Sequence, residues 1–168
     1  GARATFFVQG RWAQAYPAAA ARIAGAGHLV GLHSHFHAEM PLLSDAGLAA
    51  DIAAGDDAVR TTTGVDPRPW FRCPFGAGAD DPRVLGAIAA GGYRDVGWHV
   101  VVDDWEPDRT GDVVARDTIR GIDEHGDGAV VLLHTWPGAT ADALPAVLNE
   151  LHRRDAVTAT VDELPELP

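Results

Sequence analysis

Residues 27–37 read GHLVGLHSHFH, an apolar segment that passes directly into a cluster of histidines. The segment 28–32 predicts a buried β-strand, and positions 33–37 follow its carboxyl end. In α/β proteins, the carboxyl ends of parallel strands are where binding and catalytic side chains are placed. This stretch therefore predicts an α/β fold with a polar site where the strand ends.

The same alternation of strand and helix runs along the rest of the chain. We expect strands at 3–8, 28–32, 69–72, 95–102, 129–133 and 156–161. We expect helices at 17–26, 45–63, 81–90, 112–123 and 145–154, several of them marked by Pro or Ser starts and Gly stops. This order indicates one domain over 1–168 with a helix-covered parallel sheet, for which an α/β barrel and an open doubly wound sheet both fit.

The composition excludes several kinds of partner. The 168 residues carry a net charge of -11, and all 13 basic residues are arginine, so nucleic acid and anionic membrane surfaces are not expected partners. No apolar run approaches the roughly 20 residues that a transmembrane helix needs. The single cysteine, Cys73, excludes an internal disulfide and a multi-cysteine zinc site. We expect a monomer.

His33 and His37 form the clearest candidate metal site. On a helical turn, positions four apart share a face, and two neutral imidazoles there suit Zn²⁺, Co²⁺ or Ni²⁺. A catalytic site would still need a carboxylate as third ligand and an open position for water. The other interpretation is a surface histidine cluster without a role, and His35 is expected to be structural.

Arg72 and the turn that follows it are the second candidate group. The planar fork of an arginine can hold a buried carboxylate in place, and the Pro74-Phe75-Gly76 turn can direct a backbone N–H at a developing oxyanion. An ordinary turn beside a surface arginine fits the same residues.

Asp104 and His134 each follow a predicted strand. A carboxylate in that position can orient a histidine, and a histidine is suited to general acid catalysis near neutral pH. Trp105 and Trp136 are candidate walls of the site, and Leu132 is a candidate for lining an apolar pocket. The other interpretation is a solvated acidic turn, a strand-capping histidine and tryptophans that belong to the core.

In their order and spacing, these motifs resemble the polysaccharide deacetylase family, carbohydrate esterase family 4. Residues 33–37 are similar to its His-Ser/Thr-x-x-His motif, and 72–76 to Arg-x-Pro-Tyr-Gly. Residues 101–105 are similar to the end of Asp-x-x-Asp-Trp, and 132–134 to Leu-x-His. The segment 4–8 matches the one that the family carries before its histidine motif.

The resemblance implies an α/β fold, a distorted (β/α) barrel of the polysaccharide deacetylase type that lacks its first strand. It implies a metal-dependent hydrolase that removes acetyl groups from N- or O-acetylated sugars of the peptidoglycan, chitin or xylan class. The resemblance implies that His33 and His37 bind the metal and that Arg72 tethers the catalytic base. It implies that the N–H of Phe75 contributes to the oxyanion hole and that His134, assisted by Asp104, protonates the leaving group. The implied substrate pocket is lined by Pro74, Trp105, Leu132 and Trp136. The implied metal is one divalent ion, zinc first, with cobalt or nickel as alternatives. A secreted or cell-envelope location is also implied.

The sequence departs from the family pattern in three ways. Phe75 stands in place of Tyr, and Ala38 in place of the usual Pro. The first motif, Thr-Phe-Asp-Asp-Gly, is absent, and Glu39 is the only acidic residue before Asp45. This motif supplies the catalytic base and the third metal ligand. We expect it in a longer parent protein, and we expect the present chain alone to bind metal poorly and to hydrolyse little.

Three other interpretations stay open. The chain can be an inactive homologue, or a non-catalytic carbohydrate-binding or scaffold domain with the same fold. His33-Ser34-His35 also matches the His-x-His of amidohydrolase-type metal hydrolases, although that class needs further ligands from a longer barrel.

Overall fold

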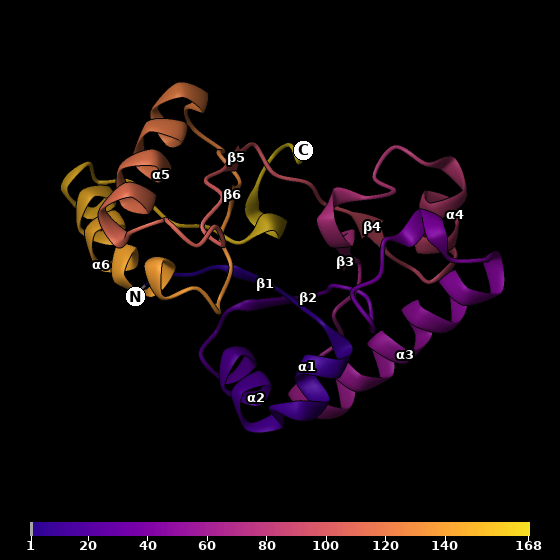
Figure 1. The fold of residues 1–168 in the computed structure, drawn as a ribbon. Coiled ribbons are helices and arrows are strands. Elements are labelled where there is room, and N and C mark those ends of the chain that lie inside the picture. Colours follow the sequence, from indigo (N-terminus) through magenta and orange to yellow (C-terminus); the bar gives the residue numbers. More distant parts are fainter. Residues whose placement is uncertain (1) are drawn as a thin grey trace. The chain divides into compact units, whose positions relative to one another are not determined.

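The computed structural model describes residues 2–168, which divide into two compact units (Figure 1). Arg3–Gly97 is called the N-terminal unit below, and Trp98–Pro168 the C-terminal unit.

The N-terminal unit is a parallel sheet with helices. Its four strands pair in the order β1-β2-β3-β4, and they span Thr5–Val8, Leu29–Leu32, Trp70–Phe71 and Arg94–Asp95. Its helices are α1 Gly10–Ala15, α2 Pro17–Gly25, α3 Asp45–Thr63 and α4 Pro82–Ala90, with 3₁₀ turns at Met40–Leu42 and Pro74–Gly76. The alternation predicted from the sequence is confirmed here.

Local signals explain where these elements begin and end. Ser44 caps α3, because its hydroxyl accepts the N–H of Gly47 at 3.1 Å, and Gly64 ends the helix in the left-handed region at φ 74°. Asp81 caps α4 in the same way. In β2, a Cβ on Gly31 would lie 2.7 Å from the ring of Phe7, so only glycine allows β1 and β2 their observed packing.

The core of the N-terminal unit lies between the sheet and the helices. Fully buried side chains from β2, β3, α3 and α4 meet there, among them Leu32, Phe71, Leu48, Val59, Val84 and Ile88. The carboxyl ends of β2 and β3 are thereby held in a rigid setting, and His33 and Arg72 follow those ends directly.

The C-terminal unit contains a parallel pair of short strands and two long helices. The strands are β5 Val100–Val101 and β6 Val131–Leu132, and the helices are α5 Gly111–His125 and α6 Gly138–Arg153. Gly121 lets α5 approach the sheet, since a Cβ there would lie 2.3 Å from a methyl carbon of Val100. None of the described helices is long and apolar enough to cross a membrane.

Three predictions about elements were wrong. The strand expected at 156–161 does not form: residues 156–160 are irregular, Val157 is 88% exposed, and Thr160 and Glu163 form a capping box on the 3₁₀ turn Val161–Glu163. The strand expected at 95–102 is two strands, β4 and β5, with an irregular stretch between them. Helix α6 begins at Gly138 rather than at Pro145, which lies inside it. The six-residue helix α1 was not predicted.

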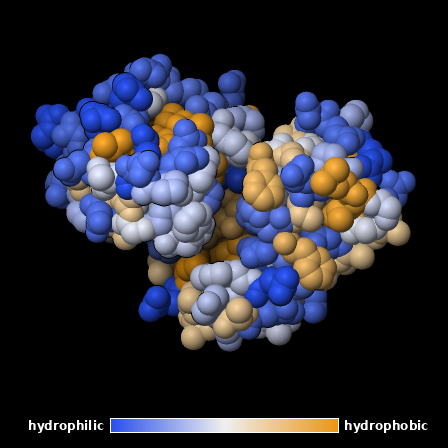
Figure 2. All heavy atoms as spheres, in the orientation of Figure 1, coloured by the Kyte–Doolittle hydropathy of each residue, from blue (hydrophilic) through white to orange (hydrophobic). Residues whose placement is uncertain are grey.

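Polar and charged residues cover much of the visible face of each unit (Figure 2). The prediction of a single domain over 1–168 stays a prediction.

Candidate active site

His33 and His37 lie together in the N-terminal unit. Their ring centroids are 4.8 Å apart and their planes meet at 72°. Nδ1 of His33 lies 2.7 Å from the carbonyl oxygen of Arg72. Because a carbonyl oxygen only accepts, Nδ1 carries the proton and Nε2 has the lone pair that a metal ion would use.

The turn that carries these two histidines is not helical, contrary to the geometry assumed from their spacing. Ser34 and His37 both adopt left-handed backbone conformations, at φ 56° and 59°. The fully buried Ser34 hydroxyl accepts the N–H of His37 at 2.9 Å. A side-chain hydrogen bond inside a strained turn therefore brings the imidazoles together.

Arg72 is buried rather than exposed, so the interpretation as a surface arginine is wrong. Its Nε donates to the carbonyl of Val96 at 2.9 Å and Nη2 to that of Gly97 at 2.6 Å, and the guanidinium lies 4.2 Å from the ring centre of Phe7. Burial lowers the pKa of Arg72 to about 10, and the negative charge of Asp95 opposes that decrease. The guanidinium therefore stays charged at neutral pH, as tethering of a carboxylate would require.

Phe75 borders the histidine pair. Its backbone is left-handed at φ 59°, the residue is 69% exposed, and its ring meets the ring of His37 edge-on at 4.5 Å. Pro74 beside it is buried. The structure thus brings His33, His37 and Phe75 into one cluster, while an oxyanion role for the Phe75 N–H stays a prediction.

Asp104 and His134 form a bonded pair in the C-terminal unit. Oδ1 of Asp104 lies 2.8 Å from Nδ1 of His134, and Oδ2 accepts the backbone N–H of His134 at 2.7 Å. Burial of the carboxyl opposes its charge, but the hydrogen bonds from His134 and Thr140 outweigh that effect and hold the pKa of Asp104 below its ordinary value. Asp104 is therefore a carboxylate at neutral pH, and it fixes the His134 tautomer with the proton on Nδ1.

Two tryptophans flank His134. The ring of Trp105 meets it edge-on at 5.0 Å, and the ring of Trp136 lies 6.1 Å away. Trp105 is 36% exposed and Trp136 69% exposed, so neither belongs to the core. Leu132 lies half-buried in β6, two residues before His134.

Thr140 was missed by the sequence analysis. Its hydroxyl donates to Oδ2 of Asp104 at 2.5 Å, from the first turn of α6. The sequence places Thr140 in a loop when Pro145 is taken as the helix start. A start at Pro137-Gly138 would have put a buried threonine opposite the strand ends.

The residues present fit part of a metal site. His33 and His37 offer two imidazole ligands, one of them with its tautomer set by the Arg72 carbonyl. Within residues 2–168, no group of three or more His, Cys, Asp or Glu side chains is placed to hold a metal ion. The fit is therefore that of two ligands out of the three that a catalytic zinc site uses.

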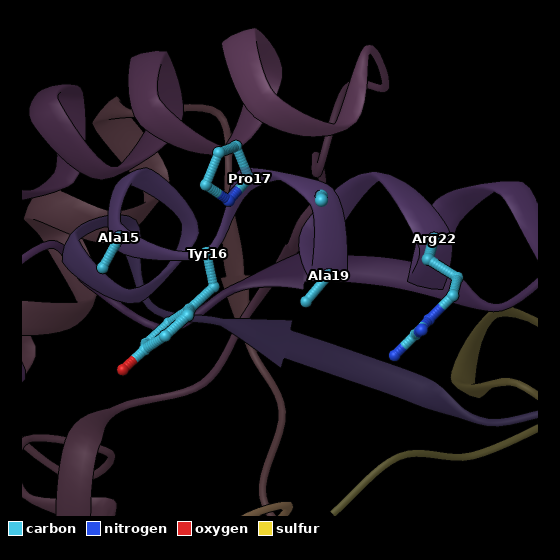
Figure 3. A pocket seen from close by; sticks show the side chains of 6 residues that line it. Ala15, Tyr16, Pro17, Ala19 and Arg22 are labelled. Atoms are coloured by element: carbon cyan, nitrogen blue, oxygen red, sulfur yellow. The ribbon is translucent and has the colours of Figure 1, made fainter.

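Two surface hollows lie outside these clusters. One of about 460 Å³ is lined by Ala15, Tyr16, Pro17, Ala18, Ala19 and Arg22 along the start of α2 (Figure 3). The other, of about 560 Å³, lies in the C-terminal unit beside the stacked rings of His99 and His125. Neither hollow is lined by a predicted site residue. The candidate site is therefore located by its histidines, Arg72 and Asp104, and not by a surface hollow.

Comparison with known proteins agrees with the motifs. Residues 1–96 match the family model described as polysaccharide deacetylase. The chain belongs to the polysaccharide deacetylase family, whose members act on acetylated polysaccharides and are generally metal-dependent.

Solved structures of this family share the fold. A carbohydrate esterase family 4 pseudoenzyme from Bacillus anthracis is 27% identical, with a TM-score of 0.87 over 98% of this chain and 56% of its own. A family 4 carbohydrate esterase from Streptomyces lividans, solved with acetate, is 28% identical, with a TM-score of 0.84 over 95% of this chain and 79% of its own. The predicted fold class is thus confirmed.

Among curated relatives, the peptidoglycan-N-acetylglucosamine deacetylase of Listeria monocytogenes is 32% identical over 96% of this chain and 33% of its own length. The chain spans 48–60% of the length of the first three curated relatives that it matches.

Proposed function

We propose that this chain supplies the metal-binding histidines and the general acid of a hydrolase that removes acetyl groups from carbohydrate polymers. The observation that carries the proposal is the Asp104–His134 pair, in which a buried carboxylate fixes the tautomer of a partly exposed imidazole. Family membership supports the same reaction class.

The proposed proton transfer follows from that tautomer. With Nδ1–H directed at Asp104, the protonated ring of His134 presents a second proton on Nε2. As water adds to the acetyl carbon and the bond to nitrogen or oxygen breaks, Nε2 gives its proton to the departing amine or alcohol. Acetate is the other product. Asp104 keeps its negative charge throughout and stabilises the imidazolium.

His33 and His37 would hold one divalent cation, of which zinc suits two imidazoles best. Such a cation, when bound, supplies a Lewis acid for the acetyl carbonyl and for a water molecule. The family resemblance assigns the third ligand and the general base to an Asp-Asp motif, which the present sequence does not contain. Activity is therefore proposed for a longer protein that would carry both this chain and that motif.

We further propose peptidoglycan as the substrate class, and a cell-envelope location with it. Relatives of this chain include peptidoglycan deacetylases. The exposed Trp136 ring beside His134 offers a flat apolar surface of the kind on which a sugar ring stacks.

The test is acetate release by the longer protein from peptidoglycan fragments, chitooligosaccharides and acetylated xylan. Replacing His134 with alanine should lower kcat by about 10²-fold or more on the best substrate. His152→Ala, at an exposed histidine in the last turn of α6, is the matched control and should leave kcat unchanged. A His134→Ala protein whose kcat stays within a few-fold of wild type refutes the proposal.

A second candidate is an inactive carbohydrate-binding homologue. The likeness to a family 4 pseudoenzyme and the two-ligand character of the histidine site favour it. A longer protein that binds N-acetylated oligosaccharides without metal and releases no acetate would establish this alternative.

A further inference from the structure

The segment His33–His37, called the histidine turn below, is held from outside by one carboxylate. Asp51 on α3 directs Oδ1 at the N–H of His35 (2.8 Å) and Oδ2 at the N–H of Phe36 (3.0 Å). Asp51 is 4% exposed. Both of its oxygens therefore bind the backbone between the two histidines.

Asp51 lies on the apolar face of its helix. The buried positions of α3 are Leu48, Asp51, Ile52, Gly55, Ala58 and Val59, a set with helical spacing that otherwise consists of small and aliphatic residues. A buried carboxylate costs much free energy unless hydrogen bonds compensate it, and here the two turn amides provide those bonds.

Helix α1 holds the carbonyl side of the same turn. The N–H of Gly10 donates to the carbonyl of Ser34 at 3.0 Å, and that of Arg11 to the carbonyl of His35 at 3.2 Å. On the other side, Gly55 allows α3 to pack closely against the turn, because a Cβ there would lie 3.1 Å from the Ser34 backbone. Two N–H groups of the turn thus bond to Asp51 of α3, and two of its carbonyls accept from the first two residues of α1.

The hydrogen bonds from α1 and to Asp51 of α3 matter because the backbone of the turn is strained. Ser34 and His37 are non-glycine residues at positive φ, a conformation that persists only where the surroundings over-determine it. Without Asp51, the amides of His35 and Phe36 would lose their partners, and the backbone between the imidazoles would be free to relax.

We propose that Asp51 is a positioning residue: its carboxylate holds the histidine turn in the conformation that lets His33 and His37 serve one cation. The inference rests on the proposed function, since it assumes that these two histidines are ligands. Asp51 itself contacts backbone amides and is not placed among the ligands.

The test is metal affinity of the longer protein, measured by competition with a chromophoric chelator for zinc and by the absorption spectrum of bound cobalt. Asp51→Ala should weaken affinity about 10- to 100-fold, as loss of outer-sphere support of a metal ligand typically does. Asp51→Asn should also weaken it, because its amide NH₂ would face an N–H group. Asp57→Asn, on the exposed side of α3, should bind like wild type.

A second control separates positioning from general loss of stability. Val59→Ala truncates a fully buried side chain on the same helix, and it should lower stability while leaving metal affinity unchanged. If Val59→Ala weakens affinity as much as Asp51→Ala does at a similar loss of stability, the positioning role is overturned.

Hydrogen exchange provides a measurement that needs no variant. The His35 and Phe36 amides of the wild-type protein should exchange slowly, and unprotected amides would overturn the inference even if Asp51→Ala failed to fold. Tight metal binding by a folded Asp51→Ala protein, within threefold of wild type, would overturn the inference alone. Absence of metal binding by the wild-type protein would overturn the proposed function and this inference with it.

Discussion

Two substitutions of Asp104, to alanine and to asparagine, should distinguish its contribution to stability from its contribution to catalysis. The side chain of Asp104 is fully buried and accepts three hydrogen bonds, two from His134 and one from Thr140. In Asp104→Ala, all three donors lose their acceptor. A buried donor without a partner costs about 1–3 kcal/mol, but His134 is 33% exposed and can regain water. We therefore expect a loss of about 3 kcal/mol in the free energy of unfolding.

Asp104→Asn should behave differently. The amide oxygen can take the place of Oδ2 and keep the bonds from Thr140 and from the His134 backbone, so stability should fall by only about 1 kcal/mol. The NH₂ group then faces Nδ1 of His134 and selects the other tautomer. Without the negative charge the imidazolium is no longer stabilised, and kcat should fall about 10²- to 10⁴-fold.

The assays are urea unfolding followed by circular dichroism and initial rates of acetate release, both on the longer protein. Asp103→Asn is the matched control. Asp103 is the exposed residue next to Asp104, and its backbone has φ 46°, a conformation that asparagine also tolerates. The reasoning fails if Asp104→Asn retains kcat within threefold of wild type, or if Asp104→Ala costs less than about 0.5 kcal/mol, the scale of an ordinary surface change.

Four further outcomes are expected. Thr140→Val should cost about 1 kcal/mol and lower kcat severalfold; equal kcat and equal urea midpoints would contradict the role given to its hydroxyl. Because the folded pKa of Asp104 lies below its ordinary 3.8, its stabilisation is complete above about pH 5 and is lost as the pH falls through the folded value. Urea midpoints between pH 6 and 3 should therefore fall more steeply for wild type than for Asp104→Asn, and parallel curves would argue against the shift. Gly55→Ala places a Cβ 2.9 Å from a buried methyl group and should cost about 1–3 kcal/mol, whereas Gly86→Ala in open space on α4 should stabilise by about 0.5–1 kcal/mol. Trp136→Ala should raise KM for a polymeric substrate about fivefold, the loss of about 1 kcal/mol of stacking, and an unchanged KM would remove it from the substrate site.

Elements with strong local signals could be predicted from the sequence. The cap of Ser44 and the left-handed Gly64 define α3, and the alternation of elements predicts the parallel sheet. Two segments were predicted wrongly. Val157 belongs to a β-prone segment, but strand formation depends on a pairing partner, and this segment finds none within the described residues. Pro145 suggests a helix start, yet α6 accommodates it in its interior.

The candidate site could be predicted as a set of residues but not as a geometry. The spacing of His33 and His37 predicts two ligands on a helical turn. In the structure the turn is not helical: Ser34 and His37 have positive φ, and the Ser34 hydroxyl accepts the His37 N–H. Asp51 bonds to the turn across 16 residues, and Thr140 bonds to Asp104 across 36. Such bonds depend on how helices pack against strand ends, and single-sequence periodicity carries no signal for them.

The partner that orients the His33 ring is a main-chain oxygen, and this has a consequence for how the site can evolve. A carbonyl group is present whichever amino acid occupies position 72, so the acceptor for Nδ1 of His33 does not depend on the identity of the side chain there. Substitution of Arg72 instead removes the guanidinium that donates to the carbonyls of Val96 and Gly97, so its effects would arise from the loss of that buried charge and of those two hydrogen bonds.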